Sequence, residues 1–146
     1  MKQKIEKIDL IVIHTFDTPS CFDGGLEECN QWHKERGFRD DKGDGMYCGY
    51  HYIIRKDGSI ENARPIDRVG AHTFGENIES IGIAWVGGGG GKDDRTNPQK
   101  AAMADLLQAL YKVLPSKKIR IRGHNDFANK ECPNFNVKDE YWWLTR

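Results

Sequence analysis

The sequence predicts an α/β fold in a single domain, residues 1–146, with helices flanking a central mixed β-sheet. Apolar segments of strand length alternate with segments of helical periodicity, which is typical of a parallel sheet. An Asp-Gly pair between two extended segments adds an antiparallel hairpin. The length of 146 residues suits one hydrophobic core rather than two.

The first half of the chain contains the first strand, one helix and the hairpin. Residues 8–13 form an almost unbroken apolar run, which predicts a central strand covered on both faces, with His14 at its end. Apolar residues at helical spacing, followed by a glycine, predict a helix near residues 25–36. Residues 50–54 and 59–62 are expected to pair as the strands of the hairpin.

The second half of the chain predicts a strand–helix–strand crossover. Residues 80–86 form another apolar strand, and Thr96 begins a capping box with proline in the first turn of the next helix. That helix is expected to end at Pro115. Its buried face is expected to comprise Met103, Leu106, Leu107, Leu110, Val113 and Leu114. A half-exposed strand then runs to Gly123, and a crossover of this kind makes the two strands parallel.

Two further segments are less regular. Residues 87–91 are all glycine and lack the Lys-Ser or Lys-Thr that a phosphate-binding loop requires, so a flexible surface loop is expected there. Residues 137–144 predict a short helix, in which Trp142 and Trp143 are expected to dock the C-terminus.

Composition and charge argue against several classes of protein. The 22 basic side chains balance 22 acidic ones, which disfavours binding to nucleic-acid phosphates or to an anionic membrane surface. No apolar run approaches the ~18 residues that a membrane span needs, and no signal peptide is visible. We therefore expect a monomer without nucleic-acid partners or membrane insertion, synthesised in the cytoplasm.

Cysteine usage favours reduced thiols over a disulfide framework. The cysteines are few and scattered, and no Cys-x-x-Cys pair is present. Cys21, Cys29 and Cys48 are expected to be reduced and structural. Cys132 is the thiol that could be recruited for a metal or for catalysis.

Three residues with metal-binding side chains are expected to meet at the sheet edge. His14 and His124 each follow the C-terminal end of an apolar strand, and parallel strands present those ends where ligands bind. Cys132 lies eight residues beyond His124, in a loop that can return to this edge. Two imidazoles and a thiolate suit zinc, and three protein ligands leave the open position of a catalytic site. Spacing alone also allows ordinary core or surface side chains.

Seven short motifs occur in order along nearly the whole chain. They are Ile11-Val12-Ile13-His14, Trp32-His33-Lys34-Glu35-Arg36-Gly37-Phe38, Gly49-Tyr50-His51-Tyr52, Lys56-Asp57-Gly58-Ser59, Ser80-Ile81-Gly82-Ile83, Gly123-His124-Asn125-Asp126-Phe127 and Lys130-Glu131-Cys132-Pro133. In these motifs the chain resembles the type 2 N-acetylmuramoyl-L-alanine amidases, the family shared by small phage endolysins and peptidoglycan recognition proteins. The resemblance implies an enzyme with one zinc ion per chain that cleaves the amide bond between N-acetylmuramic acid and the L-alanine of the stem peptide.

The resemblance also implies roles for individual residues. The family's three zinc-ligand positions are taken by His14, His124 and Cys132. Tyr50 falls on the active-site tyrosine, and Lys130 falls on the lysine that completes the site. The positions expected to line the substrate groove are those of His72, Asn77 and Phe16. Phe16 stands where small residues are common, so it is expected to alter the shape of the groove.

The chemistry of these side chains agrees with amide hydrolysis. Zinc lowers the pKa of its bound water toward ~7 and polarises a carbonyl oxygen. Tyr50, with an ordinary pKa near ~10, is expected to orient the water or to donate a hydrogen bond to the tetrahedral intermediate. Lys130 is expected to stabilise negative charge there. If residues 50–54 are a strand, Tyr52 shares the face of Tyr50 and His51 points away. The general base is left open.

We expect an endolysin of a phage or prophage that acts on peptidoglycan after release by a holin-type, membrane-permeabilising partner. One alternative is a peptidoglycan-binding module without turnover. Another is a thiol hydrolase that uses Cys132 with His124 and Asp126, although nothing in the sequence places Cys132 at an activating helix N-terminus.

Overall fold

The computed structural model describes residues 1–40 and 42–145, and within them a five-stranded mixed sheet forms the centre of the molecule. The strands are β1 (Leu10–Thr15), β2 (Tyr52–Ile54), β3 (Ile60–Asn62), β4 (Ser80–Trp85) and β5 (Arg120–Gly123). Their order is β3-β2-β4-β1-β5. Strands β4 and β5 flank β1 in parallel, β2 is parallel to β4, and β3 is antiparallel to β2. The predicted crossover and the predicted hairpin are both confirmed.

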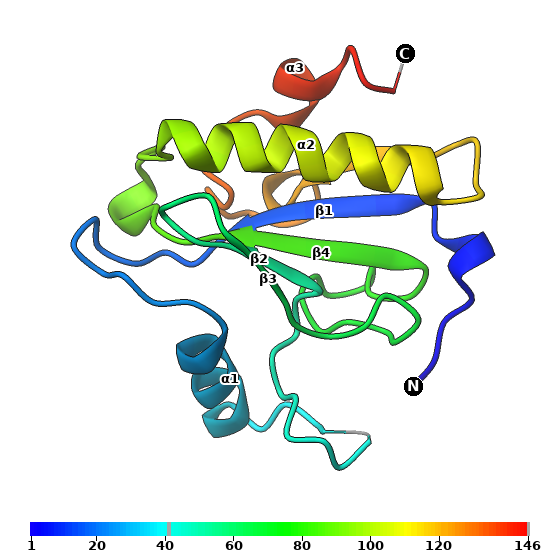
Figure 1. Cartoon of the computed structure of the whole chain (residues 1–146), viewed down its shortest axis with the longest axis horizontal. Coiled ribbons are helices and arrows are strands. Elements are labelled where there is room, and N and C mark those ends of the chain that lie inside the picture. Colours follow the sequence, from blue (N-terminus) through cyan, green and yellow to red (C-terminus); the bar gives the residue numbers. More distant parts are fainter. Residues whose placement is uncertain (41, 146) are drawn as a thin grey trace.

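Helices cover both faces of the sheet, as predicted. Figure 1 shows α2 and α3 on one side and α1 on the other. The helices are α1 (Leu26–Glu35), α2 (Asn97–Val113) and α3 (Val137–Tyr141), with single 3-10 turns at η1 (Ile5–Lys7), η2 (Gly89–Gly91) and η3 (His124–Asp126). No helix in residues 1–40 and 42–145 combines the length and the apolar character that crossing a membrane requires.

Alternation along β1 decides on which face the site lies. Ile11 and Ile13 pack under α2 against Met103, and all three side chains are fully buried. His14 is the next residue, so its side chain points to the opposite face, on the side of α1. A smaller buried cluster on that side consists of Cys29, Cys48, Ile53, Ala63 and Val86.

The predicted capping box begins α2. The Gln99 N–H donates to Thr96 Oγ1 (3.1 Å), and the Thr96 N–H donates to Gln99 Oε1 (2.9 Å). Four residues of the predicted helix face are buried: Met103, Leu107, Leu110 and Leu114. Val113 is instead 68% exposed, because it lies about 100° around the helix from Leu114.

The expectation of a flexible surface loop at residues 87–91 is wrong for its first two glycines. Gly87 and Gly88 are buried. The Gly87 carbonyl accepts from Thr15 Oγ1 (2.6 Å), and the Gly88 N–H donates to Asp94 Oδ1 (2.8 Å). Gly88 has a φ of 80°, and a Cβ there would collide with Thr15 Oγ1. Glycine at these two positions therefore lets the backbone pack closely against Thr15 of β1.

Two strand and helix boundaries also differ from the prediction. The hairpin strand begins at Tyr52 rather than at residue 50, so Tyr50 and Tyr52 do not share a face. Tyr50 packs with the cluster on the α1 side, and Tyr52 packs on the α2 side. The last helix ends at Tyr141, and Trp142 beyond it is 60% exposed. The buried residues Val137 and Tyr141 make the docking that was predicted for the tryptophans.

Candidate active site

His14, His124 and Cys132 meet on the α1 side of the sheet, near the C-terminal ends of β1 and β5. One donor atom from each side chain lies within 4.8 Å of the other two. The ring centroids of His14 and His124 are 4.7 Å apart, and Cys132 Sγ is 3.9 Å from His14 Nδ1. His14 lies within β1, one residue before its end rather than past it as predicted, whereas His124 directly follows β5.

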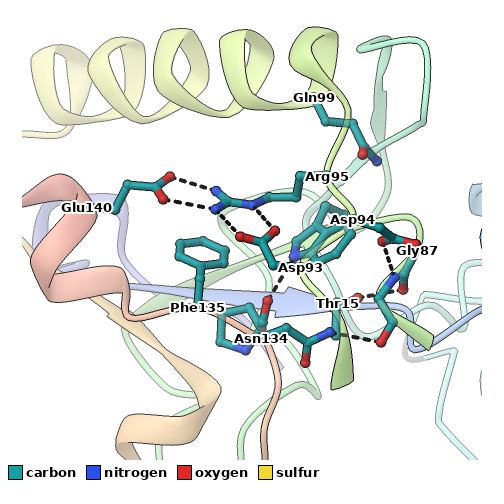
Figure 2. A network of polar contacts seen from close by, with 12 residues as sticks. Thr15, Gly87, Asp93, Asp94, Arg95, Gln99, Asn134, Phe135 and Glu140 are labelled. Atoms are coloured by element: carbon teal, nitrogen blue, oxygen red, sulfur yellow. Dashed lines mark hydrogen bonds and ion pairs between the residues drawn. The ribbon is translucent and has the colours of Figure 1, made fainter. Parts of the chain in front are cut away.

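Hydrogen bonds hold the loop of Cys132 against β1 and the glycine run. The Thr15 N–H donates to Cys132 Sγ (3.2 Å). Two residues further on, Asn134 Nδ2 donates to the carbonyls of Gly88 and Lys92 (both 2.8 Å). Figure 2 shows the Asn134 side chain reaching this segment close to Thr15. The sulfur is therefore fixed in place although its loop has no regular secondary structure.

A buried arginine fixes the same region from the other side (Figure 2). Arg95 pairs with Asp93 (2.7 Å) and Glu140 (2.6 Å), and its guanidinium carbon lies 3.5 Å from the ring centroid of Phe135. The hydrogen bonds from Arg95 hold the pKa of both carboxyls below the ordinary value. This cluster joins the segment that follows the glycine run to α3 and to Phe135, which lies between Cys132 and α3.

The second ring nitrogen of His14 is hydrogen-bonded away from the donor cluster. His14 Nε2 lies 3.0 Å from His72 Nδ1 and 3.2 Å from Thr73 Oγ1. The Ser80 hydroxyl donates to the Asn77 carbonyl (3.1 Å), so its oxygen accepts from His72 Nε2–H (3.2 Å). His72 Nδ1 is then the acceptor for His14 Nε2–H. This assignment leaves His14 Nδ1 unprotonated toward the donor cluster, as a metal ligand requires.

Asn77 and Gly82 place His72 in this position. Asn77 Oδ1 accepts from the backbone N–H groups of His72 (2.8 Å) and Thr73 (2.9 Å), so its side-chain oxygen supports the loop. His72 packs over Gly82 of β4, where a Cβ would overlap the imidazole ring. The glycine in the middle of a buried strand thus makes room for the partner of His14.

Tyr50, Phe16 and Lys130 border the donor cluster. The Tyr50 ring lies 5.2 Å from the His14 ring. It stacks on the Phe16 ring at a centroid distance of 6.2 Å. Burial raises the pKa of Tyr50 well above its ordinary value, so its hydroxyl stays protonated. Lys130 is exposed at the opening of the groove. The pKa of His124 is lowered first by its own burial and second by the charge of Lys130.

The protonation chemistry of the donors fits zinc. Burial, followed by the neighbouring His72 and His124, lowers the pKa of His14 well below its usual value, so its imidazole is neutral at pH 7. Burial raises the pKa of the Cys132 thiol to about 11. A coordinating metal removes the proton of such a thiol. Two neutral imidazoles and one thiolate form a donor set that zinc prefers.

The same geometry gives little support to a thiol hydrolase. With its pKa raised to about 11, Cys132 is a thiol at neutral pH, and only the thiolate is nucleophilic. The third member proposed for that alternative, Asp126, accepts from the Gly123 N–H (2.9 Å) and pairs with Lys138 (3.5 Å). Its carboxylate therefore caps a turn.

A groove of about 640 Å³ opens over the donor cluster. All eight predicted site residues line it: His14, Phe16, Tyr50, His72, Asn77, His124, Lys130 and Cys132. Thr73, His33, Arg36 and Phe74 also line the groove and were missed. Thr73 directly follows His72, so a hydroxyl beside a motif histidine is the signal that could have identified it.

This arrangement defines a class: an α/β protein whose groove carries a candidate metal centre suited to hydrolysis. Comparison with known proteins then gives the family. Residues 4–135 match the N-acetylmuramoyl-L-alanine amidase family. The chain therefore belongs to that family, and the predicted amidase activity is confirmed.

Phage endolysins are among the most similar relatives. The chain is 37% identical to the endolysin of Klebsiella phage KP32 over 145 residues, covering 96% of this chain and 88% of that protein. It is 38% identical to the endolysin of Escherichia phage T7 over 141 residues, covering 94% and 87%. These matches span nearly the whole length of both proteins.

Solved structures show the same fold. The N-acetylmuramoyl-L-alanine amidase LysC from Clostridium intestinale superposes with a TM-score of 0.75 at 27% identity, covering 96% of this chain and 86% of that one. Drosophila PGRP-LB superposes with a TM-score of 0.79 at 22% identity, covering 99% and 85%. The second likeness concerns the fold alone.

Proposed function

We propose that this protein is a zinc-dependent amidase that cleaves the bond between N-acetylmuramic acid and the L-alanine of the peptidoglycan stem, acting as an endolysin on the cell wall after release. The observation that carries the proposal is the convergence of His14, His124 and Cys132 in the groove of an amidase-family chain. When bound there, zinc supplies a Lewis acid for the amide carbonyl and promotes ionisation of water.

The chain's own residues supply the rest of the chemistry. Tyr50 is held protonated by burial, so its hydroxyl donates a hydrogen bond to the oxygen that becomes negative during the reaction. Lys130, exposed at the groove, stabilises the same charge and delivers a proton to the leaving amine. His72 and Thr73 fix the ring of His14 through its Nε2.

Metal analysis combined with product analysis tests this function. The purified protein should contain about one zinc ion per chain. Digestion of purified peptidoglycan should release stem peptides with new L-alanine amino termini and no new reducing sugar ends. A chelator should abolish the activity, and added zinc should restore it.

A pair of cysteine variants provides the matched control. Cys132→Ser should lose zinc and activity, whereas Cys21→Ser, at an exposed thiol outside the donor cluster, should keep both. Activity that resists chelation but not thiol alkylation would establish the thiol hydrolase instead. Binding of muropeptides without release of stem peptide would establish the binding module.

A further inference from the structure

Cys29 and Cys48 form a second sulfur cluster, outside the groove that holds the donor set. Their Sγ atoms are 3.2 Å apart although the residues lie 19 positions apart in the sequence. Both side chains are buried, with exposed fractions of 1% and 0%. Cys29 lies on α1, and Cys48 lies in the segment that leads to Tyr50. His33 completes a group of three potential metal donors within 4.8 Å of one another.

The hydrogen bond made by His33 argues against a second metal site. His33 Nδ1 accepts from the Gly49 N–H (2.8 Å), so this nitrogen carries no proton. The ring proton then lies on Nε2, so the imidazole has no free lone pair for a metal. Two thiols by themselves do not complete a buried zinc site.

Side chains of α1 hold the two sulfurs in place. Asn30 Oδ1 accepts from the N–H groups of Tyr47 (2.6 Å) and Cys48 (2.9 Å), and Asn30 Nδ2 donates to the Gly45 carbonyl (2.7 Å). These bonds fix the segment of Cys48 against the turn of α1 that carries Cys29. The sulfurs therefore need only close from 3.2 Å to the ~2.05 Å of a disulfide.

We propose that Cys29 and Cys48 are the site of a reversible disulfide that forms under oxidising conditions and links α1 to the segment leading to Tyr50. With hydrogen peroxide as oxidant, the Cys48 sulfur attacks one oxygen, the O–O bond breaks, a sulfenic acid forms and one water is released. The Cys29 sulfur then attacks the Cys48 sulfur, the S–O bond breaks, and the second water leaves with the thiol proton. The two sulfurs lose the two electrons that reduce the peroxide.

The surroundings of the pair favour this order of steps. The hydrogen bond from Cys29 lowers the pKa of Cys48 below its ordinary value, and a hydrogen bond from His33 also lowers it. The same contact raises the pKa of Cys29. We therefore expect Cys48 to be the sulfur that ionises and attacks first. Hydrogen peroxide is small and uncharged, which suits a buried pair.

The cross-link would lie close to Tyr50, which lines the groove. The Tyr50 ring lies 5.4 Å from that of His33, which is on the same helix as Cys29. A disulfide would tie this helix covalently to the chain two residues before Tyr50. The setting rests on the proposed function, because an enzyme that leaves the reducing cytosol for the cell wall meets oxidising conditions there.

Peptide mapping of the full-length protein tests the site without measuring amidase activity. After peroxide treatment and alkylation, a Cys29–Cys48 linked peptide should be the main cross-linked species, and dithiothreitol should abolish it. The oxidised protein should melt about 5–10 °C above the reduced protein, since the cross-link restricts the unfolded chain. Cys48→Ala should lose both effects, and Cys21→Ser should keep both.

Three outcomes would overturn the disulfide. Cys29 and Cys48 could both remain alkylatable while the exposed Cys21 is oxidised. The linked peptide could join Cys21 or Cys132 instead. A second zinc ion could copurify in stoichiometric amount and be lost in Cys29→Ala, which would make the cluster a metal site. Each of these results leaves the amidase proposal intact, so the two proposals fail separately.

Discussion

Replacing Thr73 by valine removes one hydrogen bond from His14 with little change of shape. Thr73 Oγ1 lies 3.2 Å from His14 Nε2 and 3.0 Å from His72 Nδ1, so the hydroxyl bridges the two rings. The side chain is only 2% exposed, and bulk water cannot easily take over its role. The substitution therefore tests whether the outer hydrogen bonds of His14 prepare it to bind zinc.

The expected result is weaker zinc binding by a folded protein. Partners that orient a ligating histidine typically contribute 10–100-fold to metal affinity. Thr73→Val keeps the His72 acceptor 3.0 Å from His14, so we expect a loss of about 10-fold, or ~1.4 kcal/mol. His72→Ala removes the main acceptor and should lose about 100-fold, or ~2.7 kcal/mol.

Competition with a chromophoric chelator measures these affinities, and near-UV circular dichroism verifies folding. Thr18→Val is the matched control, because its buried hydroxyl accepts from the Gly87 N–H (3.1 Å) and does not contact His14. Its zinc affinity should equal that of the unmodified protein. If Thr73→Val and His72→Ala both bound zinc as tightly as the control, orientation of His14 by these partners would be refuted.

Three further predictions concern catalysis and stability. Tyr50→Phe should lower kcat about 100-fold with little change in zinc content, measured by steady-state cleavage of a muropeptide, since it removes one donor to the developing charge. Glu140→Gln should lower the free energy of unfolding by about 1 kcal/mol at pH 7, after allowance for the partial exposure of the Glu140 side chain. Arg95 lowers the pKa of Glu140, so this stabilisation is present above the ordinary glutamate pKa and is lost as the pH falls through the lowered value. In urea titrations, the difference in unfolding free energy between Glu140→Gln and the unmodified protein should vanish in acid. Thr96→Ala should destabilise by about 1 kcal/mol in urea, because it removes the cap of α2.

The parts of the fold with one dominant local cause could be predicted from the sequence. The Thr96 capping box, the apolar run of β1 and the Asp-Gly hairpin all formed as expected. The start of β2 could not be placed, because pairing with β4 begins only where Tyr52 meets Ile83. Pairing across the sheet is a tertiary event, and alternation along an isolated segment does not reveal where it starts.

For the candidate site, the sequence could predict which residues line the groove but not the hydrogen bonds that orient them. The two histidines could be placed together because parallel strands end at one edge of a sheet. The contact between His72 and His14 depends on a loop that folds back over Gly82, and no periodicity marks such a loop. The burial of Gly87 and Gly88 was not predicted for a similar reason. Composition alone indicates that a glycine run is mobile, and the contact of Gly88 with Asp94 is tertiary.

The three proposed ligands differ in how the fold supports them, and this difference explains the contacts around Cys132. His14 belongs to a central strand with partners on both sides, and His124 directly follows the edge strand. Cys132 has no such support, so its position depends on the Thr15 N–H and on Asn134. The backbone of the buried Gly88 supplies one of the two carbonyl acceptors for Asn134, and a Cβ at Gly88 would collide with the Asn134 side chain. Hydrogen bonds therefore fix the irregular loop of Cys132, as strand pairing fixes the two histidines. A metal site requires all three donors to be held in position.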